Sequence, residues 1–518
     1  MGNAEVFVFL LLAVAVLAGI GLRSGIPYPV TLVLGGLVIG LVPGLPSPEL
    51  DPDVVFFAFL PPLLYSAAFT ASAFELRAYW RPIVSLATVL VILTMVAIAA
   101  AAHLVAGIQW APAFVLGALL APTDPVSATA VIRRLGASGR LETILEGESL
   151  VNDGTGLTAY KLAVAAAVGG QAGSAPEVAA KFVGVAAGGI AIGLAVAWLF
   201  GRIRSFVREP SIDVTLSVVT PFAAYVPAER VHVSGVLAAV AAGVYIGVRS
   251  LDLVEASNRL RTLSFWESAG FLLNGLLFIL IGVQLPRILD GIGGADVLTL
   301  VWDALVLTAV AVAVRMAWSL IVPAVSPFGR DSRTPVPERI AIGWSGMRGG
   351  VSLAAALAIP LDAGPHRNEL IFLAYVVVIL TLVVPGLTLA PLLRALGLSE
   401  SEGRRRAEAQ ARLRVTHAGL ERLEEVASED GVPETAVTRL RDRYEARLRR
   451  LEARAEDASD DDERAVNVQE AARLQGEMIE AEREVLRRMR RERAFSAEIL
   501  RDLEREIDLD ESRLHARS

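Results

Sequence analysis

The sequence predicts an all-α polytopic membrane protein followed by a separate, strongly charged helical tail. Of its 518 residues 54% are hydrophobic, and the mean hydropathy is +0.54, which is typical of a chain with many membrane spans. The charge changes sharply near residue 400. Residues 401–518 carry 30 acidic and 25 basic side chains, whereas the first 400 residues carry only 25 and 23. We therefore predict a transmembrane domain over 1–398 and a charged helical or coiled-coil tail over 399–518.

The number of spans follows from apolar windows of about 20 residues, the length that crosses the hydrocarbon core. Thirteen such windows are centred near residues 12, 36, 62, 94, 120, 154, 190, 220, 240, 275, 311, 348 and 382. The first has no basic segment before it, so we expect it to remain as a span. Fifteen arginines lie in the loops of one side, and only Lys181, Arg230, Arg287 and Arg367 in those of the other. This asymmetry places the tail in the cytoplasm, beneath the inner (plasma) membrane of the cell.

Two of the windows contain residues that interrupt a helix. Pro122 and Pro125 flank Asp124 in the fifth window, and four glycines occur among residues 343–350 in the twelfth. The two interruptions are seven spans apart. An odd number of spans allows two six-span halves of opposite orientation around one linking span. We therefore predict two inverted six-helix repeats, with broken helices that cross at the middle of the membrane.

Five charged side chains lie deep in the predicted membrane domain: Asp124, Glu148, Asp153, Arg315 and Arg348. A charge at the bilayer centre costs about 2.5–3.5 kcal/mol even on a lenient scale, so each is a candidate functional residue. An arginine keeps its proton and therefore requires an anionic partner or water. Two arginines can balance two carboxylates, which leaves one carboxylate able to take either a proton or a metal cation. The residues alone leave open which of the three it is.

The chemistry available in this domain favours the handling of a hard cation. Ser149 lies four residues before Asp153 and so shares its helix face, and such oxygen ligands suit a hard cation. The chain has no cysteine and no His-Glu-x-x-His motif, which argues against an intramembrane hydrolase. A passive cation channel is the second alternative, but a channel needs a continuous polar path with several weak sites. We expect no cofactor and no nucleic-acid partner.

Five ordered segments resemble the sodium/proton exchangers of the first monovalent cation:proton antiporter family, most closely its bacterial NhaP-type members with a long tail. They are Phe59–Leu64, Pro122–Pro125, Gly147–Asp153, Leu277–Gly282 and Gly346–Gly350, and the resemblance covers about residues 5–395. It implies an electroneutral antiporter that exchanges one Na⁺ for one proton by alternating access, with K⁺ or Li⁺ as alternative cations. It also implies a homodimer in the lipid membrane and a role in pH homeostasis.

The resemblance assigns roles to the buried residues. It implies that Asp153 carries the ion and the proton, and that the preceding Asn152 marks the electroneutral branch. Ser149, the carbonyl group of Thr123 and Glu148 through water would complete the shell around the cation.

The resemblance also implies how the other charges pair. Glu148 would pair with an arginine of the eleventh span, for which Arg315 is the candidate, and Asp124 of the cation site would pair with Arg348. Lys161, eight residues beyond Asp153, is expected to extend toward the outer surface; a third counter-charge is the alternative.

The tail has apolar residues at helical spacing, interrupted at residues 431–433 and 457–462. We predict two or three amphipathic helices that pack as a hairpin or coiled coil. Support of a dimer is the favoured role and sensing the alternative, since no Gly-rich phosphate loop occurs there.

Overall fold

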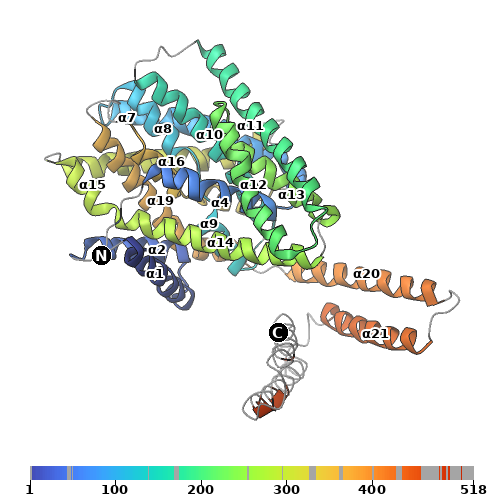
Figure 1. Cartoon of the computed structure of the whole chain (residues 1–518). Coiled ribbons are helices and arrows are strands. Elements are labelled where there is room, and N and C mark those ends of the chain that lie inside the picture. Colours follow the sequence, from blue (N-terminus) through green and yellow to red (C-terminus); the bar gives the residue numbers. More distant parts are fainter. Residues whose placement is uncertain are drawn as a thin grey trace. The chain divides into compact units, whose positions relative to one another are not determined.

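The computed structural model describes most of the chain and contains helices but no strand in the part that it describes. The described residues are 3–43, 48, 51–137, 139–168, 174–253, 256–293, 296–325, 334–360, 366–399, 402–427, 434–456 and single positions between 478 and 503. The chain divides into two units, Met1–Glu400 and Ser401–Ser518. Figure 1 shows both units, coloured along the sequence.

The helices of the first unit follow one another with short connections. The first group is α1 (Asn3–Ser24), α2 (Tyr28–Leu41), α3 (Pro52–Val54), η1 (Val55–Phe59), α4 (Leu60–Thr70), α5 (Ala73–Ala78), α6 (Trp80–Val84), η2 (Ser85–Leu90), α7 (Val91–Leu104), α8 (Trp110–Leu120), α9 (Val126–Arg134) and α10 (Gly139–Ala167). The second group is α11 (Ala175–Arg204), α12 (Pro210–Arg230), α13 (Gly235–Leu253), α14 (Ala256–Val283), α15 (Leu285–Ile292), α16 (Val297–Val325), α17 (Val336–Trp344), α18 (Gly350–Leu357) and α19 (Arg367–Ala395).

The predicted windows coincide with these helices. Twelve of the thirteen centres fall inside a helix, and the other, residue 348, falls in the gap between α17 and α18. By length and composition, eight of the described helices can cross a membrane, and three shorter apolar helices accompany them: α2, α8 and Gly235–Ser250 of α13. The all-helical membrane fold is confirmed, and the count of thirteen spans stays a prediction.

Two π-helical segments, η1 and η2, lie directly before α4 and α7. In η1 the Leu60 N–H donates to the carbonyl of Val55, five residues back. Pro61 and Pro62 follow directly and have no N–H to offer, so the α-helical hydrogen-bond pattern cannot run through them. The π-helical turn η1 therefore lies directly before the two prolines that lack a backbone N–H.

The first unit consists of two helical bundles. The scaffold bundle contains α1, α2, α4 and α11–α14, in which α14 packs on α2 and α13 packs on α4, α11 and α12. The core bundle contains α7–α10 and α16–α19 (Figure 1). In the core bundle α7 packs on α16, and each packs on the broken helix that follows it, α8 and α17 respectively. The early helices of each half thus build the scaffold, and the late helices of each half build the core.

The second unit contains α20 (Glu402–Ala427) and α21 (Glu434–Glu456), which pack against each other. Thr416, Val437 and Leu448 are buried in this pair, and Gly419 lies close to the ring of Tyr444. The two helices form the predicted packed pair. The predicted interruptions at 431–433 and 457–462, and most of a third helix, lie outside the described residues.

Candidate functional site

The two broken helices meet where they are interrupted. α8 ends at Leu120 and α9 begins at Val126, while α17 ends at Trp344 and α18 begins at Gly350. The backbone N–H of Asp124 donates to the carbonyl oxygen of Met347 over 2.7 Å. Non-helical backbone within a membrane must find hydrogen bonds inside the protein, and here each interruption supplies partners for the other. The proline and glycine signals therefore predicted both breaks correctly.

Arg348 binds backbone carbonyl groups in this crossing. Its Nε donates to the carbonyl of Leu120, the last residue of α8, over 3.0 Å, and its Nη1 donates to the carbonyl of Gly346 over 2.6 Å. The side chain is 1% exposed. The C-terminal end of a helix carries partial negative charge on its unpaired carbonyl groups. Arg348 is therefore balanced by the carbonyl end of α8 and by the second break.

Asp124 lies at the opposite kind of helix end. Its Oδ1 accepts a hydrogen bond from the N–H of Val126, the first residue of α9, over 2.9 Å. A Cβ atom on Gly349 would lie only 2.1 Å from Oδ2, so the carboxylate also touches the residue that precedes α18. Helix N-termini carry partial positive charge, which favours an anion. Only a glycine at 349 leaves room for this approach.

The predicted ion pair between Asp124 and Arg348 is not formed. Both residues are described, yet no ion pair of 4.0 Å or less joins them, and their hydrogen bonds go to backbone groups instead. The physical reason is that each charge is matched to a helix end of opposite partial charge. This pairing was an implication of the family resemblance, and the structure does not form it.

Glu148 and Arg315 form a bidentate ion pair between α10 and α16. Arg315 Nη1 lies 2.5 Å from Glu148 Oε1, and Nη2 lies 2.8 Å from Oε2. Thr123 donates its hydroxyl to the same Oε1 over 2.8 Å. Glu148 is 1% and Arg315 2% exposed. Fork-to-fork geometry with both partners buried gives a strong, directional contact, so the charge of Glu148 is compensated in place.

Asn152 joins α10 to the first break. Its Nδ2 donates to the carbonyl oxygen of Thr123 over 2.9 Å and approaches the Thr123 hydroxyl at 3.1 Å. The side chain is fully buried, and its Oδ1 has no hydrogen-bond partner in the described structure. Four residues further on, a Cβ on Gly156 would lie 2.0 Å from Pro122, so α10 passes very close to the break. Asn152 thus holds the carbonyl that was predicted to face the cation.

Asp153 differs from the other two acids. It is half-buried, and within the described residues its carboxylate has no hydrogen bond and no ion pair. Ser149, four residues earlier on α10, is also half-buried. Of Asp124, Glu148 and Asp153, it is therefore Asp153 whose charge no described hydrogen bond or ion pair balances.

The described residues offer no group of three His, Cys, Asp or Glu side chains that could hold a metal ion. A cation at Asp153 would have to draw on hydroxyl, carbonyl and water oxygens in addition to carboxylates. Such a mixed, weak shell suits an ion that is released again after binding, and it does not suit a permanently bound structural metal.

Lys161 extends to a carboxylate of the scaffold bundle. Its Nζ lies 2.7 Å from Oε2 of Glu229 on α12, and 56% of the lysine side chain is exposed. This exposed pair agrees with the expectation that Lys161 extends toward the surface, and it gives the residue a partner that the sequence did not indicate.

One buried ion pair was missed by the sequence analysis. Arg204 and Asp213 in the scaffold bundle are 1% and 0% exposed, and two hydrogen bonds of 2.7 and 2.8 Å join them. Thr262 of α14 donates to the same carboxylate over 3.2 Å. Arg204 is one of the fifteen arginines that the sequence analysis assigns to loops, but α11 extends to this residue. The sequence signal for this pair was Asp213, a charged residue that lies between apolar neighbours early in the eighth window.

Comparisons with known proteins identify the family and the fold of the chain. The family profile described as "Sodium/hydrogen exchanger, transmembrane" matches residues 9–395. An uncharacterized Na⁺/H⁺ exchanger of Mycobacterium tuberculosis is 34% identical over 98% of this chain and 96% of its own. A low-affinity Na⁺/H⁺ antiporter, NhaS1, of Synechocystis is 32% identical over 82% of this chain and 81% of its own. The solved sodium proton antiporter MjNhaP1 of Methanocaldococcus jannaschii superposes with a TM-score of 0.61 at 20% identity, covering 77% of this chain and all of that chain.

Proposed function

The chain belongs to the sodium/hydrogen exchanger family, and we propose that it exchanges one Na⁺ for one proton across a membrane, with Asp153 as the shared site. The observation that supports this proposal is the difference between Asp124, Glu148 and Asp153. Glu148 is bound to Arg315 and Asp124 to helix N-termini, whereas Asp153 has no bonded partner. A carboxylate that nothing else neutralises gains most from a proton or a cation.

Exchange at a single carboxylate accounts for an electroneutral cycle. Asp153 carries no net charge when it holds one proton, and none when it holds one Na⁺. The residue before it is Asn152, which cannot ionise, so only one exchangeable charge is present at this point of α10. An empty, charged Asp153 is costly to move through the low-dielectric middle of the membrane. The core bundle therefore carries the site from one side of the membrane to the other only when Asp153 holds a proton or a cation.

The cation shell proposed here is built around Asp153 from oxygen atoms. Ser149 shares its helix face, and the Thr123 carbonyl is held by Asn152 close to α10. Asp124 contributes negative charge nearby, and Glu148 contributes only through water, because Arg315 and Thr123 already bind its oxygens. This oxygen chemistry fits Na⁺ and does not by itself exclude Li⁺ or K⁺.

We place the protein in the inner membrane with its tail in the cytoplasm, as the arginine distribution favours, and we propose that it is a homodimer. The scaffold bundle is the element that can remain still during transport, because its buried carboxylate Asp213 is bound on both oxygens by Arg204. A dimer contact through this bundle would leave the core bundle free to move.

The test of this function is a flux measurement in inside-out membrane vesicles. A pH-sensitive dye reports an imposed pH gradient while NaCl, LiCl or KCl is added, and a second dye reports the membrane potential. An electroneutral exchanger dissipates the pH gradient without changing the potential. A passive cation channel, the second candidate, changes the potential directly, and such a result would replace the proposal.

A further inference from the structure

A polar stripe runs along α10 from Asp153 toward one end of the helix. Glu142, Glu146, Ser149 and Asp153 are separated by four, three and four residues, so they lie on one face of the helix. With a rise of about 1.5 Å per residue, Glu146 is about 10 Å from Asp153 along the axis and Glu142 about 16 Å. The arginine distribution predicts that this end faces the cytoplasm. The stripe connects that side with the ion-carrying residue.

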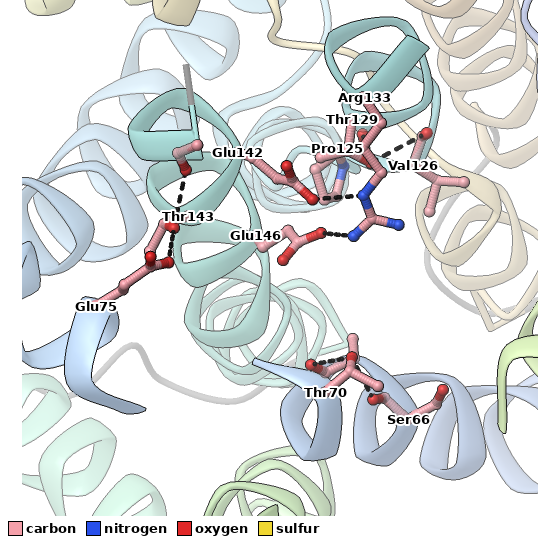
Figure 2. A network of polar contacts seen from close by, with 12 residues as sticks. Ser66, Thr70, Glu75, Pro125, Val126, Thr129, Arg133, Glu142, Thr143 and Glu146 are labelled. Atoms are coloured by element: carbon pink, nitrogen blue, oxygen red, sulfur yellow. Dashed lines mark hydrogen bonds and ion pairs between the residues drawn. The ribbon is translucent and has the colours of Figure 1, made fainter. Parts of the chain in front are cut away.

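Arg133, the second-last residue of α9, binds the two glutamates of the stripe (Figure 2). Its Nη2 lies 2.6 Å from Oε1 of Glu146, and its Nε donates to Oε1 of Glu142. α9 starts at the first break and leads away from it, so Arg133 and Glu146 reach the same place from two helices that both contribute to the ion site. One arginine therefore binds both glutamates at the end of the stripe that is predicted to face the cytoplasm.

A third carboxylate lies beside this group. Glu75 of α5, the short helix after α4, accepts a hydrogen bond from the hydroxyl of Thr143 over 2.6 Å (Figure 2). The charges of Glu75, Glu142 and Arg133 all act on Glu146. Two carboxylates thus bind one arginine, and a third lies against a neighbouring face of α10. The excess of negative charge favours the approach of another cation.

The Arg133 contacts are of a kind that can open. The arginine side chain is 62% exposed, and those of Glu142 and Glu146 are 20% and 27% exposed. By contrast, the side chains of the Arg315–Glu148 pair on the same helix are 3% and 2% exposed. Exposed ion pairs contribute little free energy because water and salt compete for both partners. Opening a buried pair costs much more, because it leaves two buried charges without a counter-charge. Of these two pairs, the Arg133 pair is the one that can exchange its partner during each transport cycle.

We propose that Arg133 is a tethered counter-cation that occupies Glu146 until an incoming Na⁺ displaces it, so that Glu146 and Arg133 set the apparent affinity for cations arriving from the cytoplasmic side. The proposal rests on the proposed exchange function at Asp153. In this arrangement Glu146 attracts the cation to the stripe, and Arg133 keeps the carboxylate compensated while no cation is present. Neither residue holds the transported ion at the turnover site.

The test is the KM for Na⁺ of the full-length protein in inside-out vesicles, where the cytoplasmic face is accessible. Glu146→Gln removes the attracting charge and raises KM about three- to tenfold with an unchanged maximal rate, and Glu146→Asp restores most of the affinity. Arg133→Gln removes the competitor and lowers KM about two- to threefold, because Na⁺ then finds both carboxylates unoccupied. If Glu146→Gln does not fold, Glu142→Gln tests the same arginine from its other partner.

Two readouts separate this role from a structural one. Added choline chloride screens charges, so it raises the KM of the wild type but has little effect on Glu146→Gln. Right-side-out vesicles show the wild-type KM for the same variant, since its effect is confined to one side. Glu209→Gln, which removes an exposed carboxylate of the scaffold bundle at the same predicted side, is the matched control and leaves KM unchanged.

A wild-type KM in Glu146→Gln, or an equal change of KM from both sides, would overturn the inference while leaving exchange at Asp153 intact. Failure of the proposed role of Asp153 is recognised separately: in that case Asp153→Asn would retain full cation-dependent proton movement.

Discussion

The core and scaffold bundles each contain a buried, bidentate arginine–carboxylate pair, and they differ in what accompanies it. In the scaffold, Asp213 is bound on both oxygens by Arg204, with Thr262 as an additional donor. In the core, Arg315 and Glu148 are bound equally closely, but Asp153 lies five residues away on the same helix without a partner. The same type of ion pair thus stabilises a static bundle in one place and supports an unbalanced acid in the other.

The difference shows that the number of buried charges does not mark the transport site. Burial and pairing are equally complete for Asp213 and Glu148, and neither can bind a proton or cation without giving up its arginine. What distinguishes the core bundle is Asp153, which has no arginine partner. We expect substitutions of the scaffold pair to change stability, and substitutions of Asp153 to change transport.

The largest expected effect is that of Asp153→Asn. Asparagine keeps the size of the side chain but can neither ionise nor release a proton, so cation-dependent proton movement should be abolished. Dye-reported pH gradients in vesicles measure this loss, and size-exclusion chromatography of the purified variant verifies that it is folded. Asp290→Asn, the same change at an exposed position of α15, is the control and should transport normally. Wild-type exchange rates in Asp153→Asn would refute the assignment.

Arg204→Ala in the scaffold should reduce the free energy of unfolding by about 3–5 kcal/mol, because it leaves Asp213 buried without a counter-charge. The double variant Arg204→Met with Asp213→Leu should recover most of that loss, since a well-packed apolar pair can replace a buried ion pair. Thermal unfolding in detergent measures both. Transport per folded molecule should stay near that of the wild type, and a specific loss of transport would mean that the scaffold pair takes part in the cycle.

Arg348→Ala and Asp124→Asn test the crossing of the broken helices. Arg348→Ala strands the carbonyl groups of Leu120 and Gly346 and should cost about 1–3 kcal/mol for each buried acceptor left unpaired. Because no ion pair joins the two side chains, the effects of the single variants on unfolding should add within about 0.5 kcal/mol in the double variant. A double variant that is clearly more stable than this sum would show direct pairing after all.

The smallest expected effect is a dependence of the Na⁺ affinity on pH. Since a proton and Na⁺ compete for Asp153, the KM for Na⁺ should rise as the cytoplasmic pH falls, by at most about tenfold per pH unit for one competing proton. The maximal rate at saturating Na⁺ should respond less than KM. Measurements in proteoliposomes at several pH values decide the point, and a KM that stays flat while the maximal rate changes would require separate sites.

The helix breaks were predictable from the sequence because their causes are local. Pro122 and Pro125 remove backbone donors, and the glycines of residues 343–350 relax the backbone, whatever surrounds them. The contact between Glu148 and Arg315 spans 167 residues, so no periodicity could indicate it, and the expectation came from the family resemblance alone. The all-helical class was equally accessible, since composition and window length determine it.

Two errors of the sequence analysis have a common physical origin. The Asp124–Arg348 pair, which the family resemblance implied, leaves out the partial charges of helix ends, which bind both residues here. The placement of Arg204 in a loop assumed that an arginine near a window boundary is solvated, but α11 extends to this residue and Asp213 lies within reach. In both cases the missing information was the location of a helix terminus in three dimensions.

The crossing of the breaks also has a consequence for how the chain is made. The carbonyl of Leu120 obtains its buried donor from Arg348, a residue 228 positions later, and the N–H of Asp124 depends on Met347. At about 5–20 residues per second, a ribosome needs roughly 10–45 s to synthesise that stretch. During this interval the first half of the protein resides in the bilayer with backbone groups that only water, lipid headgroups or an insertion chaperone can satisfy. The nascent chain is therefore most vulnerable to membrane proteases before its twelfth window has emerged.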